Sequence, residues 1–154
     1  MKLNTDRMSR RFSLLPVLAA VALATAGMSA RAEPPTDLSK LVGTWNNVNT
    51  ATGGLVRIQV SDAGTLLAVQ AFGACTPTPC DLGVVNGLPQ SLSVVSEVAE
   101  GFRATYNTGF STIVISAQRI YDVNGGTFLR VTRHTNFAAG DTRSDYVSTE
   151  VFRR

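Results

Sequence analysis

Histidine and cysteine are scarce in this chain, which has one His and two Cys among its 154 residues. A zinc site generally needs about four ligands, and only His134 and scattered carboxylates accompany the two thiols. The H-E-x-x-H, G-x-S-x-G and Gly-rich phosphate-loop motifs are missing as well. The sequence therefore gives no support to metalloprotease, serine-hydrolase or P-loop chemistry, and it predicts no catalytic residue, no metal and no cofactor.

Long apolar runs are equally scarce, and the one that is present covers residues 12–28 near the N-terminus. It is short for a membrane span and contains Pro16, and small residues at Ala30 and Ala32 follow it. Basic residues precede it: Lys2, Arg7, Arg10 and Arg11. This pattern predicts a signal peptide over residues 1–32, with Glu33 as the first mature residue. We expect a periplasmic or extracellular protein with no membrane span after processing.

The basic charge of the whole chain belongs mostly to this leader. The net charge is +3, from 14 Lys and Arg against 11 Asp and Glu. Five of those basic residues and one acidic residue lie at or before Arg31, so nine basic and ten acidic residues remain. The mature chain is thus close to neutral, and the sequence predicts no nucleic-acid partner.

Both cysteines lie in one short segment, "ACTPTPCDLG", over residues 74–83. Thiols of an exported protein meet an oxidising environment and tend to pair. Pro77 and Pro79 bend the chain between Cys75 and Cys80 and restrict it when reduced. A disulfide is the favoured interpretation, with free thiols and a metal clip as alternatives.

Helical signals are almost absent from the mature chain, whereas alternating strand patterns and turn residues recur along it. Residues 33–40 are expected to form an N-terminal extension, and 89–101 is ambiguous between a loop and an extra strand. The expected strands cover 41–49, 55–61, 65–73, 82–88, 102–107, 109–121, 127–137 and 143–154. Their short connections predict an all-β domain over 41–154, an eight-stranded antiparallel up-and-down barrel.

The segment Gly43-Thr44-Trp45 heads the first expected strand and resembles the G-x-W start of the calycin barrels, the lipocalins and avidins. The resemblance implies that Trp45 closes one end of the barrel and that an arginine from near the C-terminus packs across the indole. Arg153 or Arg154 can supply this cation, and we assign Arg153. The segments "CTPTPCD", "TGFST" and "RSDYVSTEVFRR" are also similar to a group of small exported bacterial proteins of unassigned function.

An eight-stranded barrel has room inside for side chains or for one small ligand. Amphipathic and aromatic residues are the candidates for lining such a site, with simple core packing as the alternative. These candidates are Tyr106, Phe110, Arg119, Arg133 and Tyr146. The inward face of 111–119 stays unassigned, because apolar residues occupy both of its faces.

The lone histidine offers one catalytic hypothesis. If the turn at 138–141 pairs Phe137 with Thr142, His134 lies opposite Asp145, and a carboxylate-oriented His is the core of a general base. If the turn places Gly140 in the left-handed region, the register shifts by one and Arg133 faces Asp145 as a plain ion pair.

Three functions therefore compete. The favoured one is a non-catalytic exported barrel that binds a small apolar or mixed ligand in its lumen. The second is a protein-interaction barrel, similar to the periplasmic inhibitors of secreted metalloproteases, with residues 33–40 as the blocking segment. The third is an isomerase or cyclase that works in the lumen and needs His134 and Asp145 to face inward.

Overall fold

The computed structural model describes residues 33–154, so the predicted signal peptide and its cleavage lie outside the described residues. Every regular element in this range is a β-strand. The strands are β1 (Gly43–Asn47), β2 (Leu55–Asp62), β3 (Leu67–Gly73), β4 (Cys80–Gln90), β5 (Gly101–Asn107), β6 (Ser111–Tyr121), β7 (Thr127–Phe137) and β8 (Tyr146–Arg153). Within 33–154, no helix is long and apolar enough to cross a membrane.

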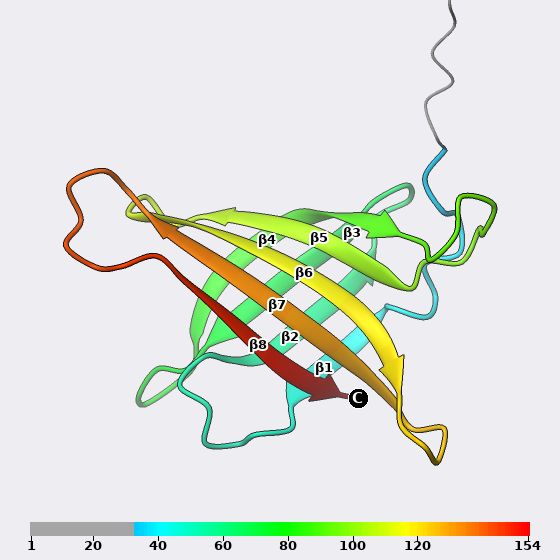
Figure 1. Ribbon diagram of the computed structural model, residues 1–154, viewed down its shortest axis with the longest axis horizontal. Helices are drawn as coiled ribbons and strands as arrows, with labels where there is room; N and C mark the ends of the chain where they lie inside the picture. Colours follow the sequence, from blue (N-terminus) through cyan, green and yellow to red (C-terminus); the bar gives the residue numbers. More distant parts are fainter. Residues whose placement is uncertain (1–32) are drawn as a thin grey trace, which may run out of the picture. The chain divides into compact units, whose positions relative to one another are not determined.

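The strands close into a barrel in the order in which they occur along the chain (Figure 1). Each strand pairs antiparallel with the next, and β8 returns to β1 through Asn46 opposite Arg153 and Asn47 opposite Phe152. Closure leaves no strand edge unpaired around the ring, which removes the template for edge-to-edge aggregation. The predicted eight-stranded antiparallel up-and-down barrel is confirmed.

Strand alternation turns one set of apolar side chains inward. On β6, Ile113, Ile115 and Ala117 are buried, which settles the face that the sequence left unassigned. On β2 the sequence pattern placed Val56 on one face with Ile58 and Val60; Ile58 and Val60 are buried, but Leu55 is buried with them in place of Val56. A β-bulge between Leu55 and Arg57 shifts the register, so Leu55 takes the inward position that the pattern gave to Val56.

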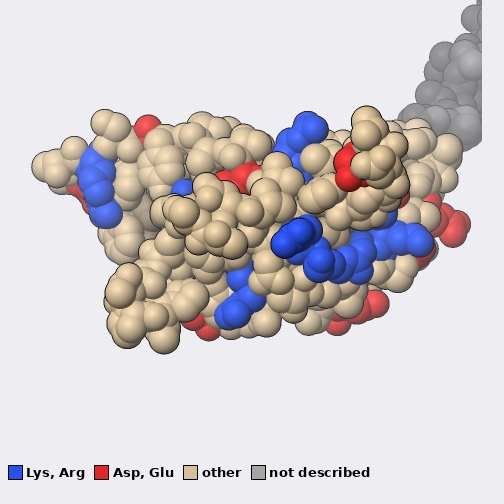
Figure 2. All heavy atoms as spheres, turned by 90° about the horizontal axis from the view of Figure 1, so that it is seen from below, with Lys and Arg blue, Asp and Glu red and all other residues tan. Residues whose placement is uncertain are grey.

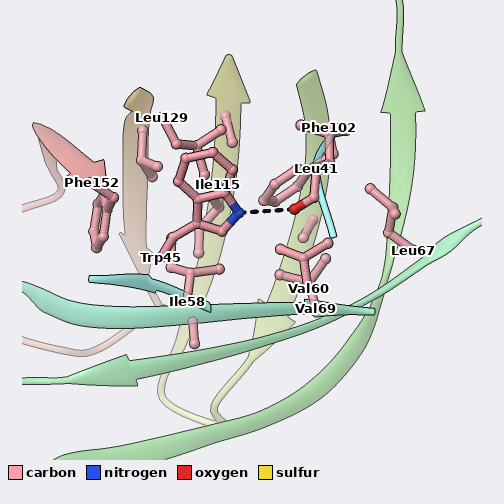
Figure 3. Close-up of a cluster of buried hydrophobic side chains, with 14 of the residues drawn as sticks. Leu41, Trp45, Ile58, Val60, Leu67, Val69, Phe102, Ile115, Leu129 and Phe152 are labelled. Atoms are coloured by element: carbon pink, nitrogen blue, oxygen red, sulfur yellow. Dashed lines mark hydrogen bonds between the residues drawn. The ribbon is translucent and has the colours of Figure 1, made fainter. Parts of the chain in front are cut away.

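Trp45 fills one end of the barrel, which we call the closed end (Figure 3). Its indole is fully buried, and Nε1 donates a 2.8 Å hydrogen bond to the carbonyl of Leu41. Buried indoles usually need such a partner for the N–H. Leu38 and Leu41, from the turn before β1, are buried with it and help to seal this end.

The cation over this indole comes from Arg154 and not from Arg153. The Arg154 Cζ lies 4.6 Å from the ring centroid, and its Nη atoms donate to the carbonyls of Lys40 and Val42 at 3.0 Å each. Arg153 is exposed, because strand alternation turns it outward next to buried Phe152. The last residue, one position beyond β8, folds back over the closed end.

The N-terminal extension is tied to the connection between β4 and β5. Asp37 forms a parallel bridge with Val98, and Ala99 N donates to Asp37 O at 2.9 Å. The ambiguous segment thus resolves into the end of β4, which reaches Gln90, and a loop over 91–100. This loop carries Glu100, whose carboxylate pairs with buried Arg119 of β6 at 2.7 Å.

The predicted disulfide is confirmed in the connection between β3 and β4. Cys75 and Cys80 are bonded, with their Cα atoms 5.4 Å apart. Ala74 N, just before the bridge, donates to Gly54 O of the β1–β2 loop at 2.8 Å. The bridge therefore fixes a rim segment that contacts its neighbouring loop.

We expect the double variant Cys75→Ser/Cys80→Ser to lose about 2 kcal/mol of unfolding free energy, because the bridge closes a short loop and restricts the unfolded chain only modestly. Urea denaturation of both proteins measures this loss. Adding reductant is expected to weaken the wild type to the level of the variant and to leave the variant unchanged. Equal stability of the oxidised wild type and the variant would show that the bridge does not stabilise the barrel.

Candidate functional site

Four loops gather at the end of the barrel opposite Trp45, on the left of Figure 1, which we call the open end. They are the connections β1–β2, β3–β4, β5–β6 and β7–β8. The lumen next to the closed end is apolar and fully buried: Trp45, Ile58, Phe102, Ile115, Leu129 and Phe152. Apart from Arg119, which pairs with Glu100 beside the β4–β5 loop, the polar inward-facing side chains described next lie toward the open end.

The register of β7 and β8 brings most of these polar side chains together. Arg133 pairs with Ser148 and Thr135 with Tyr146, on the same face as the buried pair Leu129 and Phe152. Glu150 shares this face opposite Val131. Two neighbouring strands thus direct a guanidinium, a carboxylate, two aliphatic hydroxyls and a phenol toward one region of the lumen.

Arg133 has hydrogen-bonding capacity to spare. Its Nε donates to Ser148 Oγ at 3.2 Å, and its Cζ lies 5.4 Å from the centre of the Tyr146 ring. Neither Nη atom hydrogen-bonds to any residue from Glu33 to Arg154. A half-buried guanidinium with free donors is suited to bind an anion, preferably a planar one.

Glu150, in contrast, is held by hydrogen bonds that run mainly to its Oε1 atom. Its carboxylate accepts the backbone N–H of Leu55 at 3.1 Å and the hydroxyl of Thr52 at 3.1 Å. Gly54 lies against it, and a Cβ at that position would collide with the Glu150 carboxylate and come within 3.3 Å of Arg133 Nη2. The β1–β2 loop thus approaches both charged groups closely because Gly54 has no side chain.

Two further polar groups of this half are buried. Thr135 is 4% exposed, and its Oγ1 has no hydrogen-bond partner in the described part of the chain. Tyr106 donates its hydroxyl to the Val69 carbonyl across the barrel at 2.9 Å. Burial raises the pKa of Tyr106 far above its usual value, so the phenol stays protonated and keeps donating.

Aromatic rings and one ion pair form the rim. The Arg143 guanidinium lies 4.8 Å from the Phe110 ring centre and 4.2 Å from that of Phe137. It also pairs with Asp141 at 2.7 Å. The hydrogen bond from the Arg143 side chain lowers the pKa of Asp141 to about 2, so the pair is ionised at neutral pH.

The structure brings four of the five predicted lining residues to this end. Tyr106, Arg133 and Tyr146 come from strands, and Phe110 is a half-exposed residue of the β5–β6 turn. Arg119 lies instead beside the β4–β5 loop, where it pairs with Glu100. Thr135, Ser148 and Glu150 were not among the predicted lining residues. Period-2 alternation along β7 from Leu129 and along β8 from Phe152 places all three on the inward face.

The hypothesis that His134 opposes Asp145 is wrong, and so is the alternative that opposed Arg133 to Asp145. His134 lies on the outer wall and pairs with Val147, while Arg133 pairs with Ser148. Asp145 ends the β7–β8 loop, where it accepts the backbone N–H of Phe137 at 2.8 Å. Among residues 33–154, His134 therefore has no carboxylate partner, and it lies on the face that points away from the lumen.

The outer wall carries a hollow of about 420 Å³ over β5, β6 and β7, beside the β4–β5 loop. Polar residues of these strands line much of it, among them Gln118, Arg130 and Thr132. On the face drawn in Figure 2, basic side chains lie among acidic and uncharged ones, and no single sign of charge covers that face. Within 33–154, no three His, Cys, Asp or Glu side chains gather as a metal site would require.

Comparison with known proteins places the fold. No protein-family model and no curated protein sequence matches this chain. Among solved structures, a biotin-binding protein from chicken matches with a TM-score of 0.50 and 21% sequence identity. The match covers 74% of this chain and 96% of the chicken chain. Together with the closed eight-stranded topology, it shows that this chain folds as a small calycin-like β-barrel.

Proposed function

We propose that this protein is a non-catalytic binding protein that holds a small molecule of mixed polarity in the open half of its barrel. One observation carries the proposal: the lumen there contains polar groups whose hydrogen-bonding capacity no residue from 33 to 154 uses. These groups are the Nη atoms of Arg133 and the Oγ1 of Thr135.

A buried polar group lowers the stability of the protein unless it has a hydrogen-bond partner. A buried hydroxyl without a partner costs about 1–3 kcal/mol relative to a satisfied one, and native proteins keep few of them. A ligand with a polar head and an apolar body would satisfy the polar groups and contact the aromatic ones. Ligand sites generally combine these two features, an apolar lining with a few convergent polar groups.

The chicken protein of the same fold binds biotin, according to its description. In the present chain the sole tryptophan closes the far end of the barrel and cannot also line the open half. We therefore take from that protein only the binding of a small molecule, and we argue the location and identity of the ligand from the chemistry of the open half.

The proposal includes export to the periplasm or the cell exterior. It is supported by the apolar run and small-residue site near the N-terminus and by the Cys75–Cys80 disulfide, since structural disulfides persist in oxidising compartments. The inhibitor hypothesis receives less support, because Asp37 is bridged to Val98 and Leu38 is buried. In the presumed blocking segment, Pro35 is buried as well, whereas Glu33, Pro34, Thr36, Ser39 and Lys40 are exposed.

A titration followed by two-dimensional ¹H–¹⁵N NMR tests the proposed function on the processed protein. The probes are octanamide and octanoate, which share an eight-carbon body and differ in head group. We expect at least one of them to shift the amide signals of Arg133, Thr135 and Ser148. Shifts confined to Gln118 and Arg130 on the outer wall, or no shifts with either probe, would contradict a site in the lumen.

A further inference from the structure

We propose that the ligand of the open half is an organic monocarboxylate with an apolar body, and that Arg133 binds its carboxylate. This inference rests on the proposed function and goes beyond it by naming the chemical class of the ligand. It depends on which charges of the open half are free and which are already paired.

Of the two arginines Arg133 and Arg143, Arg133 has the guanidinium N–H groups that are free to bind an anion. It extends from the inward face of β7, and its single hydrogen bond to the described chain uses Nε and leaves both Nη atoms open. Arg143, at the nearby rim, is occupied by two hydrogen bonds to the Asp141 carboxylate and by the rings of Phe110 and Phe137. An incoming anion would therefore find its donors on Arg133.

The neighbouring carboxylate limits the charge of that anion. Glu150 lies on the next strand, beside Gly54, where the Arg133 Nη2 atom also approaches. Its hydrogen bonds to Leu55 N and Thr52 Oγ1 hold it in place, so it cannot swing away cheaply. The attraction to Arg133 and the repulsion from Glu150 both double when the ligand carries two negative charges instead of one. The cost of removing the ligand from water rises more steeply with its charge, so we expect the open half to prefer a single carboxylate to a phosphate dianion.

The other surfaces near Arg133 are apolar or aromatic. Ile113 is adjacent to Thr135 across the β6–β7 pair, and Tyr146 is adjacent to it across the β7–β8 pair. The rings of Phe137 and Tyr146 lie 6.3 Å apart at the rim. A hydrocarbon body packed here would remove apolar surface from water while its head group stayed at Arg133.

Thr135 supplies the second, independent observation. Its hydroxyl is buried on the lumen face, two residues along β7 from Arg133, and has no partner from Glu33 to Arg154. The oxygen is closed off from solvent in this structure, so a ligand carboxylate reaches it only when neighbouring side chains move aside. A carboxylate oxygen is a strong acceptor for such a donor. A valine would fill the same volume without a polar atom, so packing alone does not explain a threonine at this position.

Isothermal titration calorimetry on the processed protein tests the inference with three probes of equal chain length: octanoate, octanamide and octyl phosphate. We expect octanoate to bind most tightly, with a Kd roughly 10-fold or more below that of the neutral amide. Octyl phosphate is expected to bind more weakly than octanoate at pH 8, where it is a dianion.

Variants then locate the head group. Arg133→Met should raise the Kd for octanoate by about 10-fold or more and leave the Kd for octanamide nearly unchanged. Arg133→Lys should retain part of the preference, because it keeps the charge without the planar fork. Arg130→Met is the matched control: it removes an exposed arginine from the outer face of the same strand and should have no effect on either probe.

The Thr135→Val variant distinguishes the effect of the hydroxyl on ligand affinity from its effect on stability. We expect its melting temperature to equal or exceed that of the wild type, because an unpartnered buried hydroxyl is removed, and its Kd for octanoate to rise about threefold. An unchanged Kd would show that Thr135 does not contact the ligand.

The outcomes distinguish the two proposals. If octanamide and octanoate bind equally and Arg133→Met affects neither, the carboxylate assignment fails while a lumen site for mixed ligands stands. If octyl phosphate binds best, the class of anion is wrong. If none of the probes binds, the inference and the proposed function fall together.

Discussion

Replacing Trp45 with alanine is expected to lower the free energy of unfolding by about 3–5 kcal/mol. The fully buried indole fills the closed end, donates to Leu41 O at 2.8 Å and carries the Arg154 guanidinium on its face at 4.6 Å. Alanine would leave a cavity and remove both contacts. Since domains of this size are stable by only about 5–15 kcal/mol, chemical denaturation should show a much earlier transition.

Trp45→Phe is the matched control for this prediction. It keeps an aromatic ring in the closed end but loses the N–H donor, so we expect a smaller loss, of about 1–3 kcal/mol. A loss below about 1 kcal/mol for the alanine variant would contradict the role of Trp45 as the plug of the closed end, because such a small value is typical of exposed positions.

The second large effect is expected for Glu100→Ala, at about 3–5 kcal/mol. The side chains of Arg119 and Glu100 are 7% and 19% exposed, and they meet at 2.7 Å. Removing the carboxylate leaves the Arg119 charge buried, and its Nε already lacks a partner among residues 33–154. The same change would also weaken the attachment of the β4–β5 loop to β6, which would then depend on the backbone hydrogen bond from Arg119 N to Glu100 O at 2.7 Å. Thermal and urea denaturation both measure the loss.

The double variant Glu100→Leu/Arg119→Leu separates charge burial from loss of contact. Replacing both partners by apolar groups removes the uncompensated charge, so we expect it to recover most of the stability that Glu100→Ala loses. Asp141→Asn, at the exposed pair with Arg143, should barely change stability, because solvent screens that interaction. A double variant as unstable as Glu100→Ala would mean that the loop needs the ion pair itself.

Much of the fold could be predicted because turn residues and period-2 alternation are local signals. Gly43-Thr44-Trp45 and the regular spacing of strands were enough to expect a closed barrel. The β7–β8 register could not be predicted in the same way. Gly140 and Asp141 are compatible with several loop lengths. In the structure Asp145 belongs to the loop and not to β8, and its side chain accepts the Phe137 N–H at 2.8 Å, a contact that the sequence pattern does not indicate. A small register error moves every cross-strand pair, including that of His134.

The residues of the candidate site were likewise predictable only where a local sequence pattern indicated them. Arg133, Tyr106 and Tyr146 could be suggested as amphipathic residues on expected strands. Thr135 and Glu150 could not, because their roles depend on what the other strands place around them: Glu150 accepts from Leu55 N, and the Thr135 hydroxyl meets no hydrogen-bond partner within residues 33–154. The choice between adjacent arginines near the C-terminus depended likewise on where β8 ends.

A crystal structure of the processed protein grown with octanoate tests the central claim most directly. We predict electron density for the carboxylate beside the Nη atoms of Arg133 and for the hydrocarbon against the aromatic rings of the open half. Density confined to the outer hollow by Gln118 and Arg130, or an open half filled entirely by the protein's own side chains, would contradict the claim.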